Sequence, residues 1–293
     1  MSDVVLLVET GVGLGALYFL AASGLSLIYG LMGVLNFAHG SFMVAGAYAG
    51  WLTMTGLPDS LGVGVRLSVA IVVALVVGAL IGFLVEAVLI RPLYRRHIQQ
   101  VLVTVGLSLA AVAAVQGIWG SDAHPLEKPS WLAATTDLAG AEVPNDRFLF
   151  IAAALLLFGA LLALLRFTRL GLVIRAGVEN RTMVEALGIN VQRTFSVVFA
   201  IGGAAAGLAG LLAGVYANSV SPLQGGSMLI YAFIVVVIGG MGSLTGTAIA
   251  AVAVGLVQQL ANYYAASGVG DLSVVLLLAV VLLVRPASMQ GAH

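Results

Sequence analysis

Residues 67–85 read LSVAIVVALVVGALIGFLV, a run of 19 residues without a charge. A helix needs about 20 apolar residues to cross the hydrocarbon core of a bilayer, so this run is long enough to span one. Lipid offers the backbone no hydrogen-bond partners, and a spanning segment must therefore be a helix or part of a closed barrel. The run lacks the polar–apolar alternation of a barrel strand and predicts a transmembrane helix.

Similar runs fill most of the chain. Apolar segments lie at about residues 5–30, 40–56, 65–90, 98–119, 147–166, 194–217, 226–241, 246–265 and 271–284. Of the 293 residues, 61% are hydrophobic and 8% are charged, whereas soluble domains have about 25% charged residues. Glycines join some segments, so eight to ten spans fit the sequence and we expect about nine. The sequence predicts an all-α, polytopic bundle in a lipid membrane, with residues 1–293 as one membrane domain.

The basic residues predict an orientation. Nine of the twelve Lys and Arg residues lie in residues 91–96, in residues 166–193 and at Arg285. Connections rich in Lys and Arg are usually cytoplasmic, so we expect these three places in the cytoplasm. Residues 120–147 are acidic and contain three prolines, and we expect them to form the main external loop. With nine spans, the C-terminus is predicted to be cytoplasmic and the N-terminus external.

Composition and motifs exclude several functions. Without cysteine, the chain has no disulfide, thiolate catalysis or cysteine-bound metal. A net charge of zero speaks against a nucleic-acid partner. Residues 238–246 contain four glycines but lack the Gly-Lys-Ser/Thr of a phosphate loop, and the only lysine, Lys128, lies in the predicted external loop. We predict no catalytic residues, metal or cofactor on this chain, and any energy from ATP must come through another chain.

Glycines recur at four-residue spacing within the predicted spans. Small residues at this spacing let helix backbones approach closely, which favours association in lipid. We therefore interpret these glycines as packing contacts. The pairs are Gly11 and Gly15, Gly46 and Gly50, Gly78 and Gly82, Gly203 and Gly207, and Gly210 and Gly214.

The longest predicted cytoplasmic connection, residues 167–193, contains a short helical pattern from Glu179 to Leu187. Met183 and Leu187 fall on one side of this helix, and Gly188 is placed to end it. The helix is either a docking surface for a partner chain or an interfacial helix that lies on the membrane. The residue pattern favours neither alternative.

Polar residues also interrupt the apolar pattern at Asn36, His39 and Ser41. Polar side chains at membrane depth usually face a cavity or hydrogen-bond to a neighbouring helix. A helix break that lines a translocation path and a simple cytoplasmic turn both fit this stretch. Glu86 lies within a predicted span about one turn before Arg91, and we interpret the two as an ion pair rather than as part of an ion path.

Four motifs in the same order resemble the permease subunits of branched-chain amino-acid ABC importers. They are GLSLIYG (24–30) with NFAHG (36–40), RP (91–92), RAGVENR (175–181) with ALGIN (186–190), and GGMGS (239–243) with RP (285–286). The resemblance covers nearly the whole chain. It implies a multi-pass subunit of a bacterial inner membrane that translocates branched-chain or other amino acids, or small polar solutes such as urea or amides.

The resemblance also implies partners. These are a second permease chain, either a copy or a paralogue, two ATPase subunits that hold ATP and Mg²⁺, and an extracytoplasmic substrate-binding protein that meets the external loop. In such importers a short cytoplasmic helix of the permease sits in a cleft of the ATPase. By position, the coupling residues are Glu179, Asn180, Arg181, Met183, Glu185, Ala186, Leu187 and Gly188.

Asn36 and His39 match the family motif and, with Ser41, are the predicted translocation-path residues. Many relatives have Glu where this chain has Ser41, which leaves the substrate open among the family's amino acids, urea, short amides, and aromatic or dicarboxylic compounds. One alternative is a self-sufficient channel or secondary carrier that uses Glu86 and His39 as ion or proton groups. A sugar-type ABC permease is the other alternative.

Overall fold

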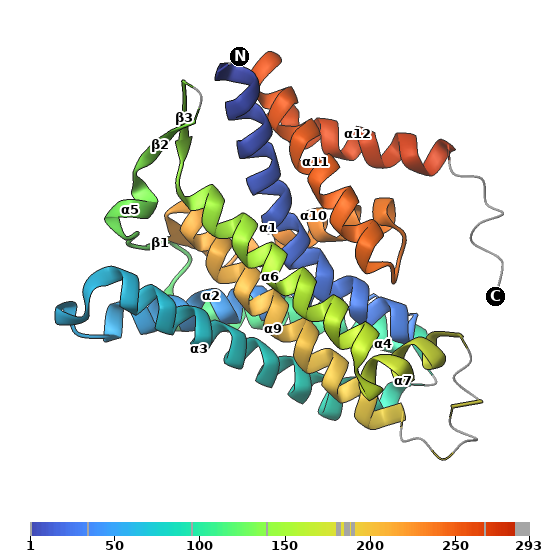
Figure 1. Cartoon of the computed structure of the whole chain (residues 1–293). Helices are drawn as coiled ribbons and strands as arrows, with labels where there is room; N and C mark the ends of the chain where they lie inside the picture. The colour runs from blue at the N-terminus through green and yellow to red at the C-terminus, as the bar shows by residue number, and fades with distance from the viewer. Residues whose placement is uncertain are drawn as a thin grey trace.

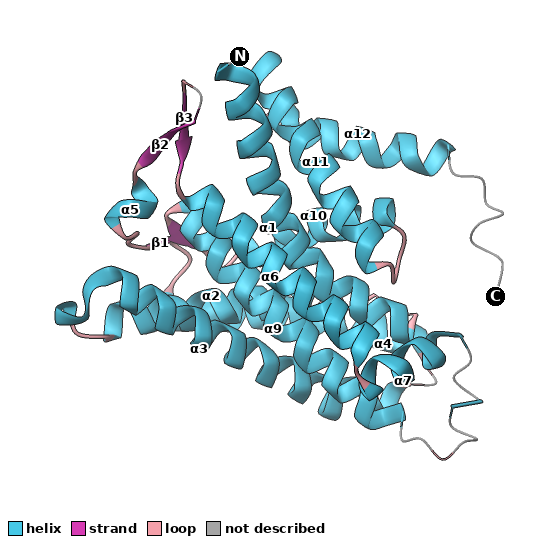
Figure 2. Cartoon of the chain, in the orientation of Figure 1, coloured by secondary structure: helices cyan, strands magenta, loops and turns pink. Residues whose placement is uncertain are grey.

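Helices make up most of the structure (Figure 2). It is a computed structural model that describes residues 2–33, 35–94, 96–138, 140–179, 183–184, 188, 191–266 and 268–284. Each predicted apolar segment coincides with one long helix, because each is a long apolar run bounded by polar or glycine residues. These helices are α1 (Ser2–Met32), α2 (His39–Gly56), α3 (Gly62–Val85), α4 (His97–Trp119), α6 (Asp146–Phe167), α9 (Val191–Ala217), α10 (Gln224–Gly239), α11 (Leu244–Tyr264) and α12 (Val269–Val284).

Six helical stretches of the described residues are long and apolar enough to cross a membrane, by length and composition. They are Asp3–Met32, Asp59–Leu93, His97–Trp119, Asp146–Phe167, Val191–Ala217 and Leu244–Tyr264. The helices α10 and α12 are apolar but shorter, with 16 residues each. The all-α, polytopic fold is therefore confirmed.

Short elements connect the long helices. The stretch before α3 contains the 3-10 turn η1 (Asp59–Leu61), and α3 continues as the π-helical turn η2 (Glu86–Ile90) and the 3-10 turn η3 (Arg91–Leu93). The helix α7 (Arg169–Glu179) follows α6. Four short strands and α5 (Ser130–Ala133) complete the described elements. The strands are β1 (His124–Pro125), β2 (Thr135–Leu138), β3 (Ala141–Pro144) and β4 (Ser219–Val220).

Residues 120–147, predicted as a loop, contain regular structure. Strands β2 and β3 form an antiparallel hairpin, with Asp137 opposite Glu142. Strand β1 pairs with β4, so this segment is joined to the connection between α9 and α10. β3 also contacts α1, and the hairpin lies at the same end of the bundle as the N-terminus (Figure 1). This arrangement agrees with the prediction that the N-terminus and residues 120–147 lie on the same side of the membrane. That this side is the external one stays a prediction.

α9 lies at the centre of the bundle. It packs against α1, α2 and α3, and 78% of its most apolar window is buried (Figure 1). The corresponding shares are 6% for α4 and 17% for α6, so these two helices lie at the periphery. Their large apolar faces are exposed in the single chain, as expected for surfaces that contact lipid or another membrane chain.

Glycines lie at close helix contacts, as predicted. A Cβ atom built on Gly203 of α9 would lie 2.2 Å from the carbonyl oxygen of Gly78 of α3. A Cβ on Gly46 of α2 would lie 2.3 Å from the Cα of Gly207. Real Cβ atoms do not approach other atoms so closely. At these crossings the backbones touch because no side chain separates them.

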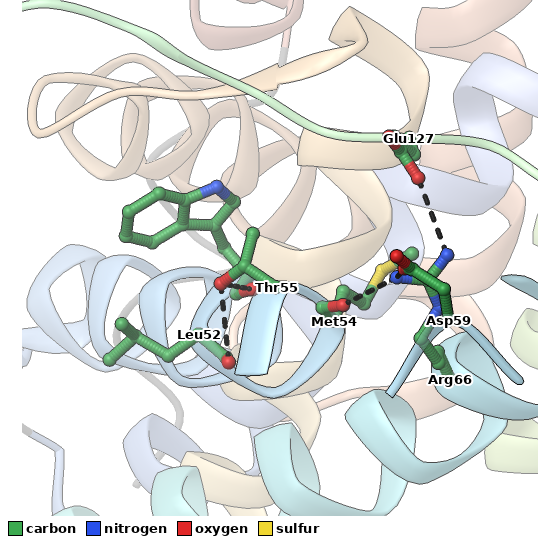
Figure 3. Close-up of polar contacts among 7 residues, drawn as sticks. Leu52, Met54, Thr55, Asp59, Arg66 and Glu127 are labelled. Carbon is green, nitrogen blue, oxygen red and sulfur yellow. Dashed lines mark hydrogen bonds and ion pairs between the residues drawn. The ribbon is translucent and has the colours of Figure 1, made fainter. Parts of the chain in front are cut away.

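Arg66 joins three segments at the hairpin end of the bundle. Its guanidinium is paired with Asp59 of η1 at 2.9 Å and with Glu127 at 3.5 Å (Figure 3). It also donates to the carbonyl oxygen of Met54 in α2 at 3.2 Å. Arg66 is 8% exposed, so these acceptors replace the water that its buried charge would otherwise need.

The remaining basic residues of this end are also paired. Nine of the twelve basic residues fall in the predicted cytoplasmic places, which leaves Arg66, Lys128 and Arg147. Lys128 pairs with Asp146 at 2.9 Å, and Arg147 pairs with the same carboxylate at 3.2 Å. Carboxylates therefore offset every positive charge at the predicted external end.

Candidate functional site

The predicted translocation-path residues lie where α1 gives way to α2. Gly33, with a φ of +66°, follows the last residue of α1 and adopts the left-handed conformation that glycine enters without strain. The Oδ1 atom of Asn36 accepts a hydrogen bond from the N–H of Ala38 at 3.1 Å, just before α2 begins. This side-chain turn fixes the direction in which the chain enters α2.

His39 is fully buried between α1 and α2. Its Nε2 lies 3.0 Å from the carbonyl oxygen of Ala21. A carbonyl can only accept, so Nε2 is the protonated nitrogen in this contact, and Nδ1 is an acceptor without a hydrogen-bond partner among the described residues. The ring also packs edge-on against Phe42, with 5.9 Å between centroids. The contact joins two helices, and a role of His39 in transport stays a prediction.

Asn36 lines two cavities. The larger has a volume of about 170 Å³ and is otherwise apolar, with Leu25 of α1 and Leu229 and Phe233 of α10 in its wall. The smaller, of about 10 Å³, lies on the side of α4. Ser41 is 8% exposed, and its hydroxyl has no hydrogen-bond partner among the described residues. The structure thus places Asn36 at cavity walls, while the path role of both residues stays a prediction.

The predicted coupling segment follows α7, which packs against α6, α1 and α9. Met183 is 64% exposed and Val184 is buried, and Gly188 has a φ of +77°, which suits a residue at a helix end. The side chain of Glu179 is not described. The coupling residues that lie outside the described residues are Asn180, Arg181, Glu185, Ala186 and Leu187.

The helix α7 was not predicted from the sequence. Leu170, Val173 and Ile174 are spaced three and four residues apart, which is the signal of an amphipathic helix. The structure turns this face inward, with Ile174 4% exposed and Arg175 exposed. The segment before the coupling residues is therefore a helix docked on the bundle.

Glu86 is the acceptor of a buried hydrogen-bond cluster. Its carboxylate is 0% exposed and pairs with Arg91 at 3.2 Å, which confirms the predicted ion pair. Ser196 of α9 donates to it at 2.5 Å, and the phenol of Tyr94 donates to its other oxygen. Burial raises the pKa of Tyr94, which keeps this phenol protonated as a donor. The cluster ties α3 to the first turns of α9, directly after the coupling segment.

A second polar network, which the sequence did not predict, joins α1, α10, α11 and α12. The phenol of Tyr18 donates to the Oε1 atom of Gln258 at 2.5 Å. The Nε2 atom of Gln258 and the phenol of Tyr231 both donate to Asp271, at 2.7 and 2.8 Å. The rings of Tyr18 and Tyr231 stack at 4.8 Å. The sequence shows these polar residues in apolar segments, but it does not show which of them meet.

Together, the packed apolar helices and the polar clusters buried between them define a multi-pass, all-α membrane protein. A family model described as branched-chain amino acid transport system / permease component matches residues 7–285. The chain belongs to this family and is a transport permease subunit, not an enzyme. No solved structure matches it.

Individual relatives agree with the family assignment. The chain is similar to the high-affinity branched-chain amino acid transport system permease protein LivH of Salmonella typhimurium, with 29% identity over 96% of this chain and 93% of the relative. LivH of Escherichia coli K12 gives the same identity and coverage. BraD of Pseudomonas aeruginosa, of the same description, is 29% identical over 96% of this chain and 94% of the relative.

Proposed function

We propose that this chain is the permease subunit of an ATP-binding-cassette importer for branched-chain or other amino acids, or for related small polar solutes such as urea or amides. The observation that supports this function most strongly is the family match over residues 7–285. The relatives LivH and BraD are named as branched-chain amino acid transport system permease proteins. The similarity covers 93% and 94% of their lengths. The substrate would cross the bacterial inner membrane as the helices alternate between inward-open and outward-open states.

The proposed machine needs other chains. This chain has no phosphate-loop motif, so we assign ATP and Mg²⁺ to two separate ATPase subunits and no cofactor or metal to this chain. A second permease, copy or paralogue, would pack against it in the membrane. The exposed apolar faces of α4 and α6 offer surface for lipid and for this second chain. An extracytoplasmic binding protein would deliver the substrate at the hairpin end.

We place the contact with the ATPase at residues 179–188, with the C-terminus on the same, cytoplasmic side. The position of α7 supports this assignment, since α7 lies at the end of the bundle opposite the β2–β3 hairpin (Figure 1). The Glu86 cluster at the start of α9 gives a rigid route from this segment into the bundle. A displacement of the coupling segment would therefore move α3 and α9 together.

Reconstitution in liposomes tests this function. With the second permease, the ATPases and the binding protein present, we expect ATP-dependent uptake of radiolabelled leucine, or of urea if the substrate belongs to the amide group. Leu187→Ala should lower uptake about tenfold or more while ATP hydrolysis continues, because one buried interface anchor is worth about 2 kcal/mol. Gln99→Ala, at an exposed position of α4, is the control and should transport normally.

Two outcomes would contradict the proposal. Uptake by the chain alone, driven by an imposed proton or sodium gradient, would identify a channel or secondary carrier. Equal uptake by the Leu187→Ala variant and the wild type would move the ATPase contact away from residues 179–188.

A further inference from the structure

The smaller cavity at Asn36 lies where five parts of the chain meet, one of which is η2 with Ile90. Its wall includes Met32 at the end of α1, Asn36 in the connection to α2, Gln100 and Thr104 of α4, and Phe199 of α9. The cavity volume is about 10 Å³. A buried water needs about 10–15 Å³ of such space and two to four polar partners, so the cavity is of the size of one water molecule.

Two polar atoms in this wall have no protein partner. Asn36 is 3% exposed and Gln100 is 1% exposed. Neither the Nδ2 atom of Asn36 nor the Oε1 atom of Gln100 has a hydrogen-bond partner among the described residues. A buried amide group without a partner costs free energy, and native structures usually satisfy such a group with protein or with ordered water.

The other atom of each amide fixes its orientation. The Oδ1 atom of Asn36 must be oxygen because it accepts from the N–H of Ala38. The Nε2 atom of Gln100 must be nitrogen because it donates to the carbonyl oxygen of Leu93 at 2.8 Å. The two lining residues therefore leave one donor, Asn36 Nδ2, and one acceptor, Gln100 Oε1, without a hydrogen-bond partner among the described residues. A water molecule can accept from the first and donate to the second.

Thr104 offers a third partner. Its hydroxyl donates to the carbonyl oxygen of Val101 at 2.9 Å, which leaves an oxygen lone pair to accept from the same water. Gln100 and Thr104 are also the two buried residues of α4. This helix is therefore held at its cavity end by polar side chains rather than by a buried apolar face.

We propose that one water molecule occupies this cavity, accepts a hydrogen bond from Asn36 Nδ2, and donates to Gln100 Oε1. The water forms a polar joint between α4 and the connection from α1 to α2. This site is a property of the folded chain and goes beyond the proposed import function. It also gives the Asn36 amide a second partner beside its turn to α2.

Radiolytic hydroxyl-radical footprinting of the purified chain detects such a water directly. X-rays generate radicals from bound water, and these oxidise the nearest side chains. Phe199 is 2% exposed and lines the cavity, whereas Phe150 is 0% exposed and lies elsewhere. We expect Phe199 to be oxidised several-fold faster than Phe150, and this difference to disappear in Gln100→Leu, which removes the acceptor without introducing an oxidisable sulfur atom. Gln99→Leu changes an exposed position next to Gln100, and it should leave the difference in oxidation rate between Phe199 and Phe150 unchanged.

A double-variant cycle gives an independent readout. Asn36→Leu and Gln100→Leu should each lower the melting temperature by about 2–4 °C, since each removes one partner of the water and also one protein hydrogen bond, to Ala38 or to Leu93. The melting temperature of the double variant should fall by less than the sum of the two single-variant shifts. If Phe199 is oxidised no faster than Phe150, or if the two shifts add, the proposed water is absent. Neither readout depends on transport, so failure of the import function leaves this test intact.

Discussion

Gly203→Leu is expected to prevent the chain from folding into its bundle. Even the first atom of a side chain at this position would lie 2.2 Å from the carbonyl oxygen of Gly78, and that neighbour is backbone that cannot rotate away. α3 and α9 would have to separate. Because α9 has the largest buried share of the candidate spans, its loss of packing would affect much of the bundle. We expect a loss of more than about 4 kcal/mol, which is exceptional for one substitution.

The measurement is the yield of monodisperse protein in size-exclusion chromatography, together with its melting temperature in detergent. Gly159→Leu in α6 is the matched control, because a Cβ at Gly159 meets no atom within 4 Å. The control should retain wild-type yield and gain slightly from a better helix former. Equal yields and melting temperatures for the two variants would show that the close contact between α3 and α9 is not required.

Glu86→Ala should be the most damaging substitution of a charged residue. It would remove a fully buried carboxylate that accepts hydrogen bonds from Tyr94, Ser196 and Arg91. Arg91 is 40% exposed and keeps a hydrogen bond to Ser196, so the loss comes from the fully buried carboxylate that links Tyr94 and Ser196 across the helices. We expect a large fall of the melting temperature in detergent. Glu86→Gln should lower the melting temperature less than Glu86→Ala, since the glutamine side chain keeps one oxygen acceptor.

Glu127→Ala is the matched control for this prediction. Glu127 also pairs with an arginine, Arg66, but its side chain is 75% exposed and the atoms are 3.5 Å apart. Exposed pairs contribute about 0–1 kcal/mol, so this variant should melt close to the wild type. A melting temperature of Glu86→Ala equal to that of Glu127→Ala would mean that the cluster does not stabilise the junction of α3 and α9.

Long-range contacts could not be predicted from the sequence. The pairing of Glu86 with Arg91 follows from their separation of one helical turn, but the donor Ser196 lies 110 residues away. The same holds for Asn36 and Gln100, which line one cavity from separate elements, and for Tyr18 and Gln258, which are 240 residues apart. Local spacing contains no information on which distant residues meet, because that depends on how the helices cross.

The amino-acid sequence by itself determined the class of fold and the positions of the long apolar helices, but not of α7. A run such as residues 67–85 must be helical in lipid because only a helix satisfies its backbone within one segment, and this constraint is local. The tertiary structure decided the neighbours: α9 at the centre, glycine backbones in contact, and polar groups buried in clusters between helices. Lipid does not favour one helix crossing over another. Close backbone contact and satisfied hydrogen bonds between helices do favour particular crossings, and they therefore decide which helices are neighbours.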